Sequence, residues 1–232
     1  TVDNQMMGGI SLYGDSIHIN LTNPAAYSKL RLTTYTAGIS RKEYRLKDWN
    51  EQQNTSVTTL DYLAIGFPLS KKMGMGFGVM PFTSVGYSLS DIRTNGNGAE
   101  VTNIYTGDGG LNRIYASIGF EPIKDLSLGV TANFNFGSLK YQRVQSVEGV
   151  QFGTLDDRVS KINGYDFNYA LNYTPRIKDK YTLFASILVN TQGNLVSKNS
   201  QTLGSFSLNN GNNVEVVDVN LDATNLRNTE LK

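Results

Sequence analysis

The stretch that decides the fold runs from residue 126 to residue 137 and reads Leu-Ser-Leu-Gly-Val-Thr-Ala-Asn-Phe-Asn-Phe-Gly. Every second residue from Leu126 to Phe136 is apolar, and the residues between them are Ser, Gly, Thr and Asn. Successive side chains of a strand point to opposite faces, so this pattern predicts a strand with one apolar and one polar face. The polar face carries small uncharged residues, where a soluble sheet exposed to water normally carries Lys, Glu and Arg. An apolar outer face and a small polar inner face are typical of a membrane β-barrel.

The same alternation recurs along the chain. Tyr165, Phe167 and Tyr169 share one face of a second expected strand, and Asp166 and Asn168 lie on the other. Further strands are expected at residues 30–45, 57–70, 73–90, 114–120 and 181–190. The sequence therefore predicts an all-β fold with about seven antiparallel strands.

The composition excludes several other classes of protein. A formal net charge of +1 over 232 residues gives no reason to expect nucleic acid as a partner. The chain has no apolar run of roughly 18 residues, which excludes a helical membrane span. It has no cysteine, which excludes disulfides and thiolate metal sites.

The connections between the expected strands alternate in length. Short turns with basic residues are expected at 70–72, 122–125 and 175–180. Long polar connections are expected at 46–56, 94–103, 146–157 and 191–213. Outer-membrane barrels have short periplasmic turns and long extracellular loops, so this order predicts up-and-down hairpins with the long loops outside the cell.

Residues 1–29 do not alternate like a strand. We expect them to form a separate segment that precedes the barrel strands of residues 30–232, and Pro24 favours a turn or short helix within it. The mixed polarity of this segment allows it to fold into the barrel lumen as a plug, or to remain a periplasmic arm.

Short motifs in this segment and beyond it suggest a family. Met7-Gly8-Gly9 is followed by Asp15 and then by Asn23-Pro24-Ala25, and Gly107-Asp108-Gly109-Gly110 precedes an expected strand. In these motifs the chain resembles the FadL/TodX family of outer-membrane transport proteins, in the divergent form of Bacteroidetes that includes PorV-like proteins. The resemblance implies a 14-stranded barrel with an N-terminal hatch that moves hydrophobic small molecules across the outer membrane. It assigns the hatch to Gly8, Gly9, Asn23, Pro24 and Ala25.

The expected strands are about half of those that the resemblance implies. The sequence also ends at residues 228–232 without the aromatic residue expected of a last barrel strand. An open sheet edge in lipid leaves backbone groups unsatisfied, so we expect these residues to be the first half of a longer polypeptide. A rival count takes the alternation at 217–222 as an eighth strand, which would allow a small closed barrel.

Motifs for catalysis are sparse, and we expect neither an enzyme nor a cofactor. His18 is the only histidine, so a paired-imidazole metal site is excluded. The Gly-x-Ser-x-Gly motif of hydrolases does not occur. Asp156 with Asp157, and Asp218 with Asp222, fit a solvated surface better than a calcium site.

The face expected to point into the lumen is mixed in polarity. By parity, its candidate residues are Met80, Phe82, Tyr115, Asn133, Asn135, Asn168, Phe184 and Leu188. A general porin lines its channel with opposed charges, whereas a carrier of amphiphiles needs apolar contact surface. The apolar members therefore favour a hydrophobic ligand in the lumen, or else they pack against the hatch.

Two functions fit this reading, and both place the protein in the lipid of the bacterial outer membrane. The first is the uptake or passage of hydrophobic small molecules through a plugged lumen. The alternative is a PorV-like partner or shuttle subunit of an outer-membrane protein secretion complex, with protein partners bound by the extracellular loops. A soluble β-sandwich binding module is a third reading, and it would be extracted without detergent. For a barrel, we expect Arg at Val130 to hinder insertion and Arg at Thr131 to be tolerated better.

Overall fold

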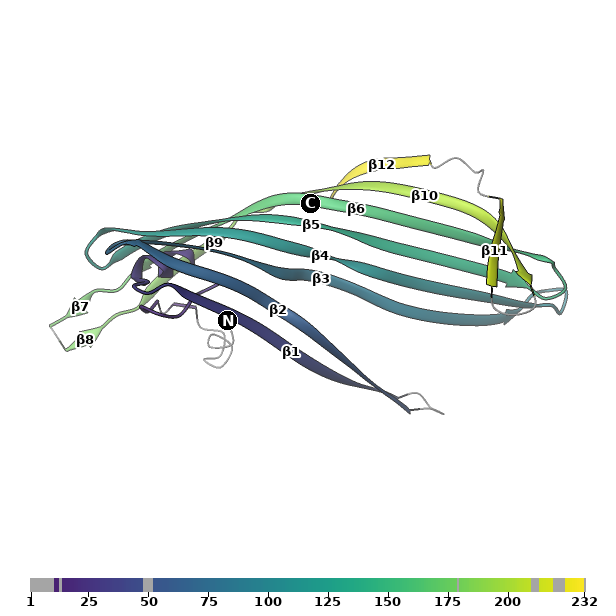
Figure 1. Cartoon of the computed structure of the whole chain (residues 1–232), viewed down its shortest axis with the longest axis horizontal. Coiled ribbons are helices and arrows are strands. Elements are labelled where there is room, and N and C mark those ends of the chain that lie inside the picture. Colours follow the sequence, from purple (N-terminus) through teal and green to yellow (C-terminus); the bar gives the residue numbers. More distant parts are fainter. Residues whose placement is uncertain are drawn as a thin grey trace. The chain divides into compact units, whose positions relative to one another are not determined.

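A computed structural model describes residues 11–12, 14–47, 52–178, 180–209, 213–218 and 224–231. Within these residues the structure is all-β apart from the short 3-10 helix η1 (Pro24–Lys29), as Figure 1 shows. The first six strands are β1 (Thr34–Lys47), β2 (Gln52–Ser70), β3 (Met73–Thr94), β4 (Glu100–Ile123), β5 (Leu126–Val147) and β6 (Phe152–Tyr173). The remaining strands are β7 (Arg176–Ile177), β8 (Tyr181–Thr182), β9 (Ala185–Asn190), β10 (Asn194–Asn209), β11 (Asn213–Asp218) and β12 (Thr224–Leu231).

Ten of these strands form one sheet with an up-and-down order. Hydrogen-bonded neighbours follow the path β1-β2-β3-β4-β5-β6-β10-β11, while β9 also pairs with β6 and β12 with β10. Strand β6 pairs with β5 along one of its edges. Strands β9 and β10 both pair with the other edge of β6, so together they take the place of one strand. Strands β7 and β8 pair only with each other as a separate hairpin in the described part of the chain.

The residues group into two compact units. Unit 1 comprises Thr1–Pro81, Arg113–Phe134 and Tyr165–Gly193, and unit 2 comprises Phe82–Asn112, Asn135–Gly164 and Asn194–Lys232. Strands β3, β4, β5 and β6 each contribute residues to both units.

The seven strands expected from alternation are confirmed as β1 to β6 and β9. Two of the three expected short turns are also confirmed, at Lys71–Lys72 and at Lys124–Asp125, where Asp125 adopts a φ of 67°. The third expected turn, at 175–180, is larger and contains the hairpin of β7 and β8. Residues 183 and 184 interrupt the strand that was expected over 181–190.

The expectation of long polar loops is wrong wherever the structure describes them. Strand β3 continues to residue 94 and β4 begins at residue 100, while β5 ends at 147 and β6 begins at 152. Residues 194–209, expected in a loop, form β10. Polar and apolar residues are mixed on both faces of these stretches, so alternation gives no signal there, yet backbone pairing with a neighbouring strand continues regardless of side-chain polarity. Residues 48–51, within the expected connection at 46–56, lie outside the described residues.

The end of the chain differs from both strand counts. Strand β11 covers the start of the alternation at 217–222, and residues 219–223 lie outside the described residues. Strand β12 was not expected. Among the described strands β1 pairs only with β2, so the path of paired strands does not close on itself. The 14-stranded count stays a prediction.

The polar face of the unit 1 strands is the buried one, as the sequence predicts. In β5, Ser127, Thr131 and Asn133 are 2–3% exposed, whereas Leu128 and Val130 are 42% and 38% exposed. The same holds in β4, where Ser117 is buried and Ile118 exposed. A soluble protein buries apolar side chains to gain about 25 cal/mol per Å². These parts of β4 and β5 have the opposite arrangement.

Candidate functional site

The buried polar face of unit 1 is covered by the chain between residues 14 and 31, which we call the N-terminal segment. Helix η1 lies in the second half of this segment and is the purple coiled ribbon in Figure 1. Ile19, Tyr27 and Leu30 of the segment form a buried cluster with Ala64 of β2 and Tyr115 of β4. The segment also makes hydrogen bonds to the sheet and approaches it closely with its backbone.

Four glycines of the sheet let the segment approach closely, three of them its backbone and Gly76 the ring of Tyr27. A Cβ atom on Gly74 or Gly76 of β3 would collide with Tyr27, and one on Gly119 of β4 would collide with the backbone at Pro24 and Ser28. A Cβ on Gly129 of β5 would collide with the backbone of Pro24 and Ala25. Three adjacent strands thus supply a glycine seat, defined by Gly74, Gly76, Gly119 and Gly129, on which η1 rests.

Asn23 both begins η1 and binds it to the sheet. Its Oδ1 accepts the Ala25 N–H at 3.1 Å, which caps the helix. Its Nδ2 donates to the Ser11 carbonyl at 3.0 Å and to Asn172 Oδ1 of β6 at 2.9 Å. The side chain is fully buried, so its hydrogen bonds are made within the protein.

Asn23→Ala should lower the free energy of unfolding by about 2 kcal/mol. The substitution removes the helix cap, and it removes the hydrogen bond that the buried Asn172 Oδ1 accepts from Asn23. Urea unfolding in detergent would measure the change. Asn97→Ala is the control, because residue 97 is exposed in the turn between β3 and β4. Equal effects of the two substitutions would contradict the role of Asn23.

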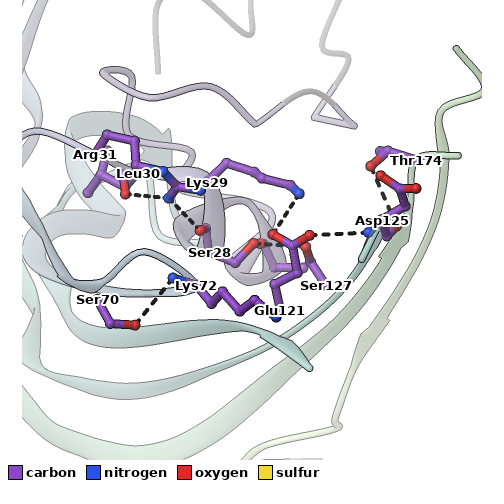
Figure 2. A network of polar contacts seen from close by, with 11 residues as sticks. Ser28, Lys29, Leu30, Arg31, Ser70, Lys72, Glu121, Asp125, Ser127 and Thr174 are labelled. Carbon is purple, nitrogen blue, oxygen red and sulfur yellow. Dashed lines mark hydrogen bonds and ion pairs between the residues drawn. The ribbon is translucent and has the colours of Figure 1, made fainter. Parts of the chain in front are cut away.

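A polar network fixes the end of η1 to the turn between β4 and β5 (Figure 2). The Ser28 hydroxyl donates to Ser127 Oγ at 2.8 Å, and Lys29 Nζ donates to Glu121 Oε2 at 2.8 Å. Glu121 is 9% exposed, and its other oxygen accepts the Asp125 N–H at 3.1 Å. The Arg31 guanidinium donates to the Ser28 and Leu30 carbonyls. The one buried carboxylate in this network is therefore paired with a cation.

The centre of the site holds two buried phenols. The hydroxyl oxygens of Tyr27 and Tyr115 lie 3.4 Å apart, and those of Ser117 and Thr131 lie 2.6 Å apart. Burial raises the pKa of Tyr27 to about 12, so this hydroxyl stays protonated near neutral pH. Farther along the same face, Arg113 of β4 and Asn133 of β5 both donate to Asp166 of β6. The face offers neutral donors and paired charges rather than a nucleophile beside a base.

A turn at the start of the segment is held by Asp15. Its carboxylate accepts the backbone N–H groups of Ile17 and His18 and contacts His18 Nδ1. Burial on its own would raise the pKa of Asp15, but the hydrogen bonds from His18 and Ile17, with the charge of His18, lower it below the usual value. The ionised carboxylate is therefore the form that stabilises this turn.

The turn should lose stability in acid. A carboxyl whose pKa is lowered by folding stabilises the folded state above its unfolded pKa, near 4, and this stabilisation is lost as the pH falls through the lower folded value. Hydrogen exchange at residues 15–18, corrected for intrinsic rates, should therefore accelerate below about pH 4. Asp15→Asn should abolish this step, and a step that persists in the variant would contradict the assignment.

The sequence-predicted site residues are only partly brought together. Pro24 and Ala25 lie on the glycine seat, and Asn23 bonds to Asn172 of β6. Gly8 and Gly9 lie outside the described residues. The lumen-facing candidates that are buried or pack on the buried cluster are Tyr115, Asn133, Asn135 and Met80.

The other four lumen-facing candidates are more open. Asn168 is half-buried, and Leu188 lies opposite buried Ala170 in the pairing of β6 with β9, which places it on the same face. Phe82 is 46% exposed. Phe184 is 44% exposed and precedes β9, so strand parity does not assign its face.

Several residues of the site were not expected from the sequence. They are Tyr27, Ser28, Lys29, Gly119, Glu121, Ser127, Gly129, Asn172 and Ser186. Strand parity does place Gly119, Gly129, Ser127 and Asn172 on the polar face. Parity carries no information on which of them meet the N-terminal segment, in which the partners of Ser127 and Asn172 lie 99 and 149 residues away in sequence.

No helix in the part of the chain that the structure describes is long and apolar enough to cross a membrane. Among the same residues, His, Asp and Glu form no group of three or more that could hold a metal ion.

Comparison with known proteins identifies the family of this chain. The family model described as BamG matches residues 1–232. No curated protein matches the chain, and no solved structure does. The match is not to the FadL/TodX family, so that resemblance stays a prediction. The all-β structure and the family match are compatible with an outer-membrane β-barrel protein. Because the match covers every residue, the chain belongs to the BamG family.

Proposed function

We propose that this chain forms part of the wall of an outer-membrane β-barrel and acts as a partner subunit of a complex that assembles or secretes outer-membrane proteins. The observation that carries the membrane location is the reversed burial of unit 1. Val130, Ile114, Phe167 and their neighbours expose apolar surface, while Ser127, Thr131 and Asn133 are buried. Lipid is the solvent that makes this arrangement favourable.

The N-terminal segment supports a sealed barrel rather than an open channel. Tyr115 and Met80, two of the apolar residues that favoured a hydrophobic ligand, instead pack against the segment. The backbone of η1 touches the sheet at the glycine seat, which leaves no room there for cargo. In this proposal the segment is a plug, and the assignment of Asn23, Pro24 and Ala25 to a hatch is retained as part of it.

Strand length supports a role with a protein partner. Strands β3, β4, β5 and β6 contain 22–24 residues, which is roughly 70–80 Å at about 3.3 Å per residue. The hydrocarbon core is only about 30 Å thick, and a tilted strand of about 10 residues spans it. Because the described loops are short, the extra strand length would carry the partner contacts. The name of the matching family also suggests outer-membrane assembly.

The passage of hydrophobic small molecules is the second candidate. Leu188 lies on the polar face, opposite Ala170, and yet is 38% exposed. The N-terminal segment therefore does not cover all apolar side chains on this face, and a hydrophobic ligand would find contact surface there.

A deletion strain separates the two candidates. Loss of a partner subunit should lower the amounts of other outer-membrane or secreted proteins, measured by quantitative mass spectrometry, and leave the uptake of a radiolabelled long-chain fatty acid unchanged. Loss of a carrier should give the reverse result. Extraction of the wild-type protein from cells without detergent would contradict both candidates and favour a soluble sandwich.

A further inference from the structure

The outer face of the β1–β2 hairpin changes from apolar to basic along its length. On β1, Tyr35 and Ile39 are 85% and 71% exposed. Arg41 and Arg45 follow on the same face of the strand, since all four residues have odd numbers. Arg41 is 64% exposed at its side chain. The guanidinium groups therefore begin where the apolar surface of this strand ends.

The outer face of β2 changes from apolar to polar at the same position along the hairpin. Pairing places Leu60 opposite Ile39, Thr58 opposite Arg41 and Asn54 opposite Arg45. Residues 52–60 of β2 carry no charge. Asp61, at the register shift between the two strands, accepts hydrogen bonds from the hydroxyls of Ser40 and Thr59. The apolar band of both strands thus ends between Ile39 and Arg41.

A polar groove of about 440 Å³ lies directly beyond this boundary. Arg41, Glu43, Arg45, Asn54 and Ser56 line it. Arg41 reaches Ser56 Oγ and Glu43 Oε1 only at 3.5 Å each, so it is held loosely in an exposed ion pair. On the face of β1 that carries Arg41, residues 41–47 contain three cationic side chains and one carboxylate, which leaves an excess of positive charge beside the groove.

We propose that Arg41 and Arg45 form a site for the phosphate of an anionic lipid head group. The site rests on the proposed membrane location, since the apolar band ending at Ile39 would then end at the head-group level. A guanidinium binds phosphate through two parallel N–H donors, and the uncharged side chains of Asn54 and Ser56 add neutral polar groups. Basic residues at that depth attract anionic lipids.

The test is a lipid titration of the full chain in detergent, followed by native mass spectrometry. Dioleoylphosphatidylglycerol should bind more tightly than dioleoylphosphatidylcholine. The double variant Arg41→Gln/Arg45→Gln should weaken phosphatidylglycerol binding by about fivefold for each guanidinium, or about 25-fold in total, without changing phosphatidylcholine binding. Unchanged phosphatidylglycerol binding in the double variant would overturn the proposal.

Two further variants guard against misfolding as an explanation. Glu43→Gln removes the carboxylate that competes for Arg41, so it should tighten phosphatidylglycerol binding, which a misfolded protein would not do. Arg93→Gln is the matched control, because Arg93 is exposed but bonded to Asp91 at 2.7 Å, and it should bind as the wild type does. A loss of binding in Arg93→Gln as large as that in the double variant would contradict a local site.

Inorganic phosphate distinguishes a lipid from a free anion. At millimolar concentration it should not displace phosphatidylglycerol, and displacement would assign the groove to a soluble anion instead. The location is tested separately by reconstitution into phosphatidylcholine nanodiscs. Failure to enter nanodiscs contradicts the membrane location, whereas entry with equal affinity for the two lipids contradicts only the head-group site.

Discussion

Gly129→Val should expel the N-terminal segment from the sheet and lower the free energy of unfolding by about 3 kcal/mol. The new side chain would occupy the space of the Pro24 and Ala25 backbone, and neither backbone atom is the end of a flexible side chain that can turn away. Valine favours strands, so β5 itself should persist. The predicted result is an intact sheet without its cover.

Limited trypsin digestion measures this outcome, because Lys29 is the last residue of η1 and Arg31 lies just after the helix. Cleavage at these residues should be fast in Gly129→Val and slow in the wild type. Gly86→Val is the matched control, since Gly86 also lies within a strand but a Cβ there would meet no atom within 4 Å. If trypsin cuts both variants at the wild-type rate, the close contact at Gly129 does not hold the segment.

Val130→Arg should make membrane insertion less favourable by about 2–4 kcal/mol if Val130 faces the middle of the bilayer. Val130 belongs to the exposed apolar face of β5. A guanidinium there would have to leave water for lipid, where it has no partner. Folding into phosphatidylcholine vesicles, followed by urea titration, measures the change.

The comparison variant is Asn168→Arg rather than the Thr131→Arg expected from the sequence. Thr131 is 3% exposed and its hydroxyl lies 2.6 Å from that of Ser117, so an Arg side chain there would crowd its neighbours and add a packing cost to the comparison. Asn168 lies on the polar face of β6 and is only half-buried. Arg at residue 168 should therefore cost well under the Val130→Arg value. If the two substitutions raise the free energy of insertion equally, the assignment of Val130 to the lipid-facing side and Asn168 to the polar side is contradicted.

Alternation predicts a strand only where its two faces differ in polarity. Leu126 to Gly137 alternate fully and form the first half of β5, and the other strongly alternating stretches also form strands. Residues 194–209 carry a mixture of polar and apolar residues on both faces and were expected in a loop, but they form β10 because β6 offers its edge. Pairing with a neighbour is a tertiary contact, so single-strand periodicity does not contain it.

The candidate site was predictable in type but not in its contacts. Pro24 predicts a short helix or turn, and η1 begins at this residue. The polar parity of Ser127 and Gly129 predicts that they face inward. That Ser28 bonds to Ser127, and that Ala25 rests on Gly129, follows only when the segment is folded onto the sheet, since these partners lie about 100 residues apart.

By itself, the sequence determined that this protein is all-β, where seven of its strands lie, and which face of unit 1 is polar, because these properties follow from a two-residue period along a single strand. The tertiary structure decided how far the strands extend and what covers their polar face. Both depend on contacts between distant residues: the backbone pairing that continues through polar stretches, and the glycine seat that three strands form together.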